Sequence, residues 1–302
     1  MTLTAVLAVT LSAQAQLLWK ISGNGIEKPS YIVGTHHVAP IGMQDSIPGL
    51  MKALQATDQV WGELVMSEMA SPQGMVELQK YMAAPADSTL NVLLSPAQID
   101  SVANLISKYA GQAIPTQQLI YLRPAVLGAQ LAVLQNMNAI PGFNPNAQLD
   151  NIIQQLGAKA GKSIHGLETI TQQLNLLYGS PLTEQATDLM KMVRNDATAA
   201  SKARDMARAY LSGDLDAINK FMTDPDFGMS PQEADKLIYN RNSAWVDFLI
   251  GALPTTSMLI AVGAGHLPGE KGVISLLKKS RLQCHTCRRI IRNDSDPQSH
   301  LP

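Results

Sequence analysis

The chain has 302 residues, of which 46% are hydrophobic and 16% charged, a balance typical of a folded globular protein rather than a disordered one. Its formal net charge of -1 at pH 7 lacks the basic excess of most nucleic-acid-binding proteins, so we expect no nucleic-acid partner. This length suits one large α/β domain or two small ones.

The N-terminus has features of a secretory signal. Residues 3–11 are mostly apolar, and Ala13-Gln14-Ala15 fits a small-x-small cleavage site. No Lys or Arg precedes the apolar run, and an N-terminal strand or helix is the alternative. We expect residues 1–15 to be a signal peptide that directs the protein to the periplasm, the cell envelope or the medium. No other stretch is apolar and long enough to cross a bilayer, so no integral span is expected after signal removal.

The N-terminal region is predicted to contain strands and one helix. Apolar alternation predicts strands over residues 17–21, 30–33 and 59–61. The first two are joined by a hairpin turn at the glycine-rich residues 23–25. A helix is predicted over 47–56, with Ser46 as its N-terminal cap and Pro48 in its first turn.

The middle of the chain is predicted to be mainly helical. Ser95-Pro96 opens one helix, and a strand is predicted over 163–165. Further helices are predicted over 119–137, 147–156, 170–177 and 184–222, the last broken near Gly213, and over 231–253. A strand over 258–262 is followed by a turn and a final helix.

This order of elements predicts the fold class. Strands lie towards both ends of the chain, so the ends must meet to form one sheet, which the helical middle then covers. We therefore expect an α/β (α+β) protein with a central mixed sheet, formed as a single domain over residues 16–279.

Two of the predicted strands end in the same short motif. Each is followed by Gly-x-x-His, Gly34 to His37 in one case and Gly263 to His266 in the other. Glycine permits a sharp turn where a side chain would clash. The histidine then follows the carboxyl end of a strand, which is where ligand sites form in α/β sheets. For each motif alone, the alternative is a turn histidine bonded to the backbone.

Two other strands deliver carboxylates in the same way. Glu63 follows the strand in QVWGEL, and Glu168 follows the strand in SIHGLET. Imidazoles and carboxylates together suit a divalent transition metal with open positions for water, and the metal lowers the pKa of that water. A carboxylate that does not bind the metal can act as a general base. The alternatives are a solvated strand-end residue for Glu63 and a first-turn helix carboxylate for Glu168.

Arg241 is predicted to point towards the core. It lies four residues after Leu237 and four before Trp245, on the apolar face of the predicted helix. A buried arginine needs an anionic partner. It either clamps a carboxylate of the site or an oxyanion of the substrate, or it forms a structural ion pair, for example with Glu63. Asn242 is a second candidate hydrogen-bonding group.

Four segments in this order resemble the TraB/PrgY/GumN family, which is related to the Tiki proteins. They are LLWKISGNGIEKPSYIVGTHH, HGLETITQQL, YNRNSAW and AVGAGHLPGEKGVISLLKK, and the resemblance runs from about residue 17 to residue 279. It implies a fold like that of erythromycin esterase and the haem-binding ChaN proteins. It also selects His37 rather than His36 as the functional histidine of the first motif.

The resemblance implies a metal-dependent hydrolase of the peptidase type, because Tiki proteins are similar to metal-dependent proteases that use Mn²⁺ or Co²⁺. His37, His266 and Glu63 are then expected metal ligands, with Zn²⁺ as another candidate ion. Glu63, Glu168, Arg241 and Asn242 are expected catalytic residues, with Glu168 as a base or a support of the ligands and Arg241 stabilising negative charge. The substrate is expected to be a peptide or a small molecule. The alternative is an envelope protein that binds a peptide or haem without cleaving it.

The last part of the chain departs from the resemblance. Residues 280–302 are basic and then polar, and we expect them to form a divergent, disordered tail. They contain Cys284-His285-Thr286-Cys287, which is similar to a redox or zinc motif. Without a second cysteine pair or a βαβ context, we favour no such role for these cysteines.

Overall fold

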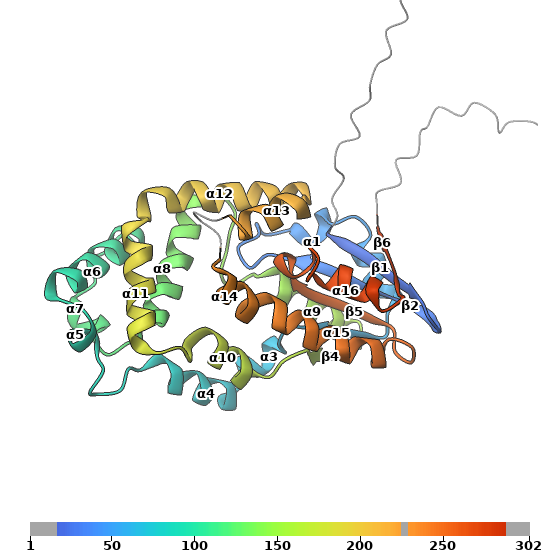
Figure 1. Cartoon of the computed structure of the whole chain (residues 1–302), viewed down its shortest axis with the longest axis horizontal. Helices are drawn as coiled ribbons and strands as arrows, with labels where there is room; N and C mark the ends of the chain where they lie inside the picture. The colour runs from blue at the N-terminus through green and yellow to red at the C-terminus, as the bar shows by residue number, and fades with distance from the viewer. Residues whose placement is uncertain (1–16, 225–228, 288–302) are drawn as a thin grey trace, which may run out of the picture.

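The computed structural model describes residues 17–224 and 229–287 (Figure 1). The expected signal peptide, residues 1–15, lies outside the described residues, as do residues 288–302 of the expected tail. None of the helices in the described part of the chain combines the length and apolar character that crossing a bilayer requires.

A six-stranded mixed sheet forms the centre of the fold and joins the two ends of the chain. Its strand order is β4-β3-β5-β2-β1-β6. The strands are β1 (Leu18–Gly23), β2 (Ile26–Thr35), β3 (Gln59–Gly62), β4 (Ser163–Gly166), β5 (Met258–Gly263) and β6 (Gln283–Thr286). The C-terminal strand β5 lies between β2 and β3, so the predicted fold class is confirmed.

Four adjacent strands run parallel. β5 pairs in parallel with β2 and β3, and β4 pairs in parallel with β3. In register, Thr35 is opposite Gly263 and Gly62 is opposite both Ala261 and Gly166. The carboxyl ends of these strands therefore meet at one edge of the sheet, where parallel sheets place their ligand sites.

The disorder expected from residue 280 does not extend to the first part of that segment. Gln283–Thr286 forms strand β6, which pairs antiparallel with β1 and places Cys284 opposite Ile21. The Cys284 side chain is buried in the core, and burial raises the pKa of its thiol to about 11. A protonated core thiol is chemically inert, which agrees with a packing role for Cys284. Both Cys284 and Cys287 are free thiols.

The helix predicted over 47–56 begins later than expected, at Leu50, and a separate short helix precedes it. α1 covers Met43–Ser46 and α2 covers Leu50–Ala56, so Ser46 ends one helix instead of capping the next. Gly49 precedes α2 with a φ of 84°, a left-handed conformation that glycine adopts without steric cost. The apolar pattern could not show this break, because it continues across both helices.

The middle of the chain is helical, as predicted, with additional breaks. The helices are α3 (Met66–Met69), α4 (Pro72–Met82), α5 (Leu90–Leu93), α6 (Pro96–Ala110), α7 (Thr116–Leu119), α8 (Pro124–Ala139), α9 (Leu149–Lys159), α10 (Ile170–Tyr178), α11 (Leu182–Arg194), α12 (Asp196–Ser212) and α13 (Leu215–Met222). Ser95 caps α6 in a capping box with Gln98. Pro124 begins α8, which the prediction had merged with the preceding turn.

Part of this helical region builds a lobe beside the sheet. Helices α5, α6, α8 and α11 pack around a hydrophobic cluster of their own, which includes Val102, Leu127, Leu131 and Leu189. In Figure 1 these helices stand on one side of the molecule and the sheet on the other, with α12 and α13 running back towards the sheet. The sheet has a separate, larger cluster that includes Val33 and Ile260.

The last helical unit covers the region next to β5. It consists of α14 (Pro231–Ala234), a π-helical turn (Asp235–Tyr239) and α15 (Asn240–Ala252). After β5, a short 3₁₀-helix (Ala264–His266) leads to α16 (Val273–Lys279). π-Helical turns are rare and occur frequently at functional sites, and this one ends two residues before Arg241.

Candidate metal-binding and catalytic site

The carboxyl edge of the parallel strands carries the predicted functional side chains. His37 follows β2, Glu63 follows β3, Glu168 follows β4 and His266 follows β5. A cavity of about 240 Å³ is lined by His37, Glu63, Arg241 and His266. Residues from both ends of the chain thus line one cavity, which is the geometry that the two Gly-x-x-His motifs predicted.

The two Gly-x-x-His motifs pack directly on each other. Gly34 lies within β2, and a Cβ atom added to it would come within 2.9 Å of Leu267 Cδ1 and 3.0 Å of Ala264 Cα. The backbone of Gly34 is not left-handed. This glycine is needed for the close approach of the second motif, and not for the sharp turn that the sequence suggested.

We expect Gly34→Ala to destabilise the protein by about 1–3 kcal/mol, because overpacking a filled core has this cost. Gly251→Ala is the matched control, since Gly251 lies in helix α15 and an added Cβ would have no neighbour within 4 Å. Glycine is unfavourable inside a helix, so the control should be neutral or slightly stabilising. Urea unfolding measures both variants. Equal stabilities of the two would contradict the packing argument.

Arg241 bridges the two glutamates. Its Nη2 donates to Glu63 Oε2 at 2.5 Å, and its Nε donates to Glu168 Oε1 at 2.7 Å. Nη2 also donates to Glu168 Oε2 at 3.1 Å. The three side chains are only 10% to 13% exposed. Glu63 is therefore not a solvated strand-end residue, and Arg241 forms a buried ion pair with both carboxylates.

Trp245 completes this network from the next turn of α15. Its Nε1 donates to Glu168 Oε1 at 3.0 Å, and its ring lies 4.7 Å from the Arg241 guanidinium carbon. Arg241 and Trp245 thus share one helix face, as their spacing predicted. Glu168 precedes Thr169, the N-terminal cap of α10, and so it is not a first-turn helix carboxylate. Glu168 directs both of its oxygens at Arg241.

Glu63 is held in its ionised form. Burial alone would raise the pKa of its carboxyl group, but the neighbouring His266, the Arg241 charge and the hydrogen bond from the Gly263 N–H together lower it. That backbone N–H donates to Glu63 Oε1 at 2.8 Å. Gln173 Nε2 donates to Glu63 Oε2 at 3.2 Å. The carboxylate is thus fixed in orientation.

Asn242 determines the tautomer of His266. The Asn242 side-chain nitrogen donates to the carbonyl oxygens of Lys271, at 2.8 Å, and of His266, at 3.3 Å. Its Oδ1 is therefore the acceptor that lies 2.7 Å from His266 Nδ1, so that Nδ1 carries the proton. His266 Nε2 is left with a lone pair, at 3.1 Å from Arg241 Nη1 and 3.8 Å from Glu63 Oε1. Burial lowers the pKa of His266 to about 4, which keeps this ring neutral.

His37 has a partner that the sequence analysis missed. Its Nδ1 lies 3.2 Å from Asp150 Oδ2, and Thr35 Oγ1 donates to Asp150 Oδ1 at 2.6 Å. The charge of Asp150 raises the pKa of His37 to about 9. Asp150 lies in the first turn of α9, where an acidic residue is common in any helix. No sequence signal therefore distinguished it.

His36 also lines the cavity, next to the predicted functional His37. Its ring centroid lies 5.2 Å from that of Tyr210, and its Nε2 is buried without a hydrogen-bond partner among the described residues. Burial lowers the pKa of His36 to about 4. The two adjacent histidines thus differ in surroundings, because one is neutral against an aromatic ring and the other is paired with a carboxylate.

The donor types around the cavity fit a divalent transition metal, although they are not arranged as a closed metal cluster. His266 Nε2 carries a lone pair, and Glu63 lies close to it, with His37 lining the same cavity. Two imidazoles and a carboxylate are ligands that such ions accept. Within residues 17–224 and 229–287, no group of three or more His, Cys, Asp or Glu is gathered closely enough to hold an ion. The Arg241 guanidinium bonds to the groups that a cation would contact.

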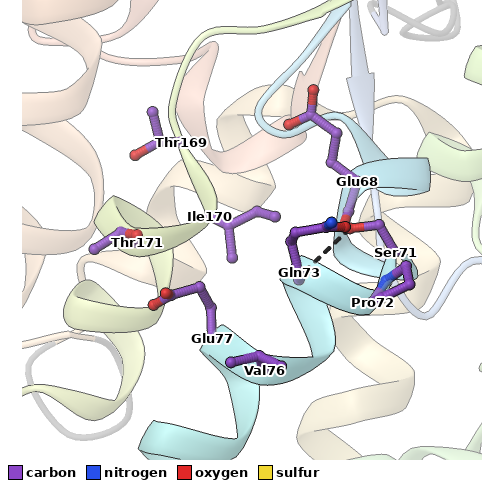
Figure 2. A pocket seen from close by; sticks show the side chains of 10 residues that line it. Glu68, Ser71, Pro72, Gln73, Val76, Glu77, Thr169, Ile170 and Thr171 are labelled. Carbon is purple, nitrogen blue, oxygen red and sulfur yellow. Dashed lines mark hydrogen bonds between the residues drawn. The ribbon is translucent and has the colours of Figure 1, made fainter.

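A second pocket, of about 600 Å³, adjoins the same sheet edge (Figure 2). Its walls are the segments that follow the two site glutamates, namely α3 and the start of α4 after Glu63, and the start of α10 after Glu168. Glu68 and Glu77 are its acidic lining residues, and Figure 2 shows them on opposite sides of Ile170.

Comparison with known proteins agrees with the sequence resemblance. The chain is 22% identical to "Metalloprotease TIKI homolog" of Amphimedon queenslandica, over 96% of this chain and 64% of that protein. It is 23% identical to "Metalloprotease TIKI2" of Danio rerio, over 87% of this chain and 59% of that protein. It is 25% identical to "Metalloprotease TIKI1" of Xenopus tropicalis, over 96% of this chain and 66% of that protein.

The chain thus spans 59% to 66% of the length of these three relatives. No solved structure matches it significantly. The family model described as TraB/PrgY/gumN family matches residues 17–284, which include all the predicted site residues and the first two residues of strand β6. The chain belongs to the TraB/PrgY/gumN family.

Proposed function

We propose that this protein is a metal-dependent hydrolase that cleaves peptides at the cavity between the two Gly-x-x-His motifs. The main support is that His37, His266, Glu63 and Arg241 line one cavity although they come from opposite ends of the chain. The relatives named as metalloproteases support the reaction class. The apolar, signal-like segment at residues 1–15 supports the proposal that the protein is exported and meets its substrate outside the cytoplasm.

In this proposal His37, His266 and Glu63 are the metal ligands. A bound Mn²⁺, Co²⁺ or Zn²⁺ ion would polarise the scissile carbonyl and lower the pKa of a bound water. Asn242 keeps the proton on Nδ1 of His266, so Nε2 carries the lone pair that would bind the metal. The pKa of Glu63 is lowered, which favours the ionised carboxylate that a metal ligand requires.

Arg241 has the role of stabilising negative charge that develops on the substrate. Glu168 and Trp245 hold the guanidinium in place through hydrogen bonds and ring contact. Since both oxygens of Glu168 face Arg241, we assign Glu168 to positioning Arg241 rather than to proton transfer. In this proposal, the second pocket would hold the part of a peptide substrate that extends beyond the scissile bond.

The second candidate function is a protein that binds a peptide or haem and does not cleave it. One observation favours it, namely that Arg241 bonds to both Glu63 and His266, where a catalytic metal would need access. A binder needs the cavity and its charges but no metal-activated water. The two functions therefore differ in turnover.

Metal titration with a turnover assay tests the proposal. Protein stripped with a chelator should bind Mn²⁺ or Co²⁺ in calorimetry, and only the loaded protein should release new amino termini from short peptides, detected by mass spectrometry. His285→Ala is the control, because His285 is exposed on β6, away from the cavity. Stoichiometric peptide capture without new amino termini would favour the binder. Equal turnover with and without metal would exclude the metal-dependent mechanism.

A further inference from the structure

We propose that Asp150, anchored by Thr35, is a positioning residue that holds His37 with its Nε2 directed to the cavity and thereby strengthens metal binding. The metal part of this inference rests on the proposed function, while the positioning part concerns the protein without metal. Nothing in the sequence pattern assigned a role to either Asp150 or Thr35.

The first support is the geometry of the carboxylate. Asp150 comes from α9, yet both of its oxygens face the end of β2, where Oδ1 accepts the Thr35 hydroxyl hydrogen and Oδ2 lies 3.2 Å from His37 Nδ1. The residue is only 7% exposed, so its ionised side chain requires compensation. His37 is the partner that approaches it at ion-pair distance among the described residues.

The second support is the state that this contact imposes on His37. A carboxylate oxygen only accepts hydrogen bonds, and Asp150 Oδ2 is buried with no hydrogen-bond partner among the described residues, so a proton on His37 Nδ1 at 3.2 Å would compensate it. The other ring nitrogen, Nε2, is then the atom available for a ligand. The His37 side chain is 61% exposed, and without Asp150 its ring would have little to restrict its orientation. Asp150 thus restricts a side chain that the backbone turn leaves exposed.

The third support is the matched arrangement on the opposite side of the cavity. His266 Nδ1 donates to Asn242 Oδ1, and His37 Nδ1 lies 3.2 Å from Asp150 Oδ2, at ion-pair distance. In both Gly-x-x-His motifs, Nδ1 of the histidine therefore faces an oxygen of a buried side chain from a helix. Ligand histidines in metal sites commonly donate their second N–H to such a partner, which fixes the tautomer and raises ligand basicity.

The Thr35 hydroxyl holds the Asp150 carboxylate in place by a hydrogen bond. Thr35 is the last residue of β2 and is 1% exposed, so its hydrogen bond to Asp150 is shielded from water. A hydrogen bond to an ionised group is stronger than one between neutral groups. Thr35 therefore fixes the carboxylate relative to the strand that also carries His37.

The test uses Asp150→Asn, which keeps the size of the side chain and removes its charge, with Asp100→Asn on the exposed face of α6 as the control. In metal-free protein, imidazole nitrogen NMR at a pH where His37 is neutral should show the proton on Nδ1 in the wild type. In Asp150→Asn the proton should be shared with Nε2, because the amide can act as donor or acceptor. His37→Ala assigns the signals.

Metal affinity is the second measurement. Asp150→Asn should weaken Mn²⁺ or Co²⁺ binding about 10- to 100-fold, as loss of such a supporting partner does. Thr35→Val keeps the carboxylate and removes only its anchor, so it should have a smaller effect and remains informative if Asp150→Asn does not fold. Asp100→Asn should leave the affinity unchanged.

The outcomes separate this inference from the proposed function. If the wild type binds no metal, the proposed function fails, and the nitrogen spectrum still decides whether Asp150 positions His37. An unchanged Nδ1 proton in Asp150→Asn and Thr35→Val would overturn the inference. Unchanged metal affinity in both variants of a metal-binding wild type would overturn it as well.

Discussion

His266→Ala should abolish both metal binding and peptide hydrolysis. A bound metal contributes several kcal/mol to the stabilisation of the transition state, and each 1.36 kcal/mol is tenfold in rate, so kcat/KM should fall by about 10³-fold or more. His266 is 4% exposed, and its Nε2 points to Arg241 and Glu63 in the cavity. Calorimetric titration and a peptide assay measure the two effects separately.

Variants with smaller expected effects test whether the loss in His266→Ala comes from the role of His266 as a metal ligand. Asn242→Leu removes the acceptor for His266 Nδ1 and should cost a smaller factor, about 10- to 100-fold in metal affinity. His285→Ala should be indistinguishable from wild type. If His266→Ala retains wild-type metal affinity and turnover, the proposed site is wrong.

Arg241→Met should produce the largest loss of stability. The change leaves the buried carboxylates of Glu63 and Glu168 without their shared cation, and breaking a buried ion pair on one side typically costs about 3–5 kcal/mol. The free energy of unfolding, measured with urea, should fall by this amount. Metal-free protein is the right sample, because a bound cation would replace part of the lost charge.

Two comparisons isolate the cause of this loss. Adding Glu168→Gln to Arg241→Met removes one of the uncompensated charges, so the double variant should be more stable than Arg241→Met alone. Lys28→Met breaks an ion pair with Asp58 in which the two side chains are 51% and 57% exposed, and it should cost less than about 1 kcal/mol. Similar losses in Arg241→Met and Lys28→Met would show that burial of the pair is unimportant.

Sequence patterns predicted best the features that depend on residues close together in the chain, such as strand ends and helix caps. The strand ends before His37, Glu63, Glu168 and His266 were predicted because apolar runs stop there at glycine. The capped start of α6 and the break at Gly213, whose φ is 67°, follow from local backbone preferences. The orientation of Arg241 followed from helical spacing alone.

Some errors arose where a single backbone position interrupts a continuous apolar pattern. Gly49 precedes the start of α2 inside the helix predicted over 47–56, and Pro124 begins α8 inside the helix predicted over 119–137. Strand β6 was missed because residues 280–302 depart from the family resemblance and carry no strand pattern of their own. Its pairing with β1 depends on an edge of the sheet that exists only after folding.

The amino-acid sequence by itself determined the fold class, the family and the residue types at the sheet edge, because periodicity and glycine-containing motifs act over a few neighbouring residues. Only the tertiary structure decided the partners of those residues. Asp150 meets His37, and Arg241 joins Glu63 to Glu168, through contacts between segments far apart in the chain. Such contacts depend on how β2, β3, β4, α9 and α15 pack together, and no local pattern encodes that packing.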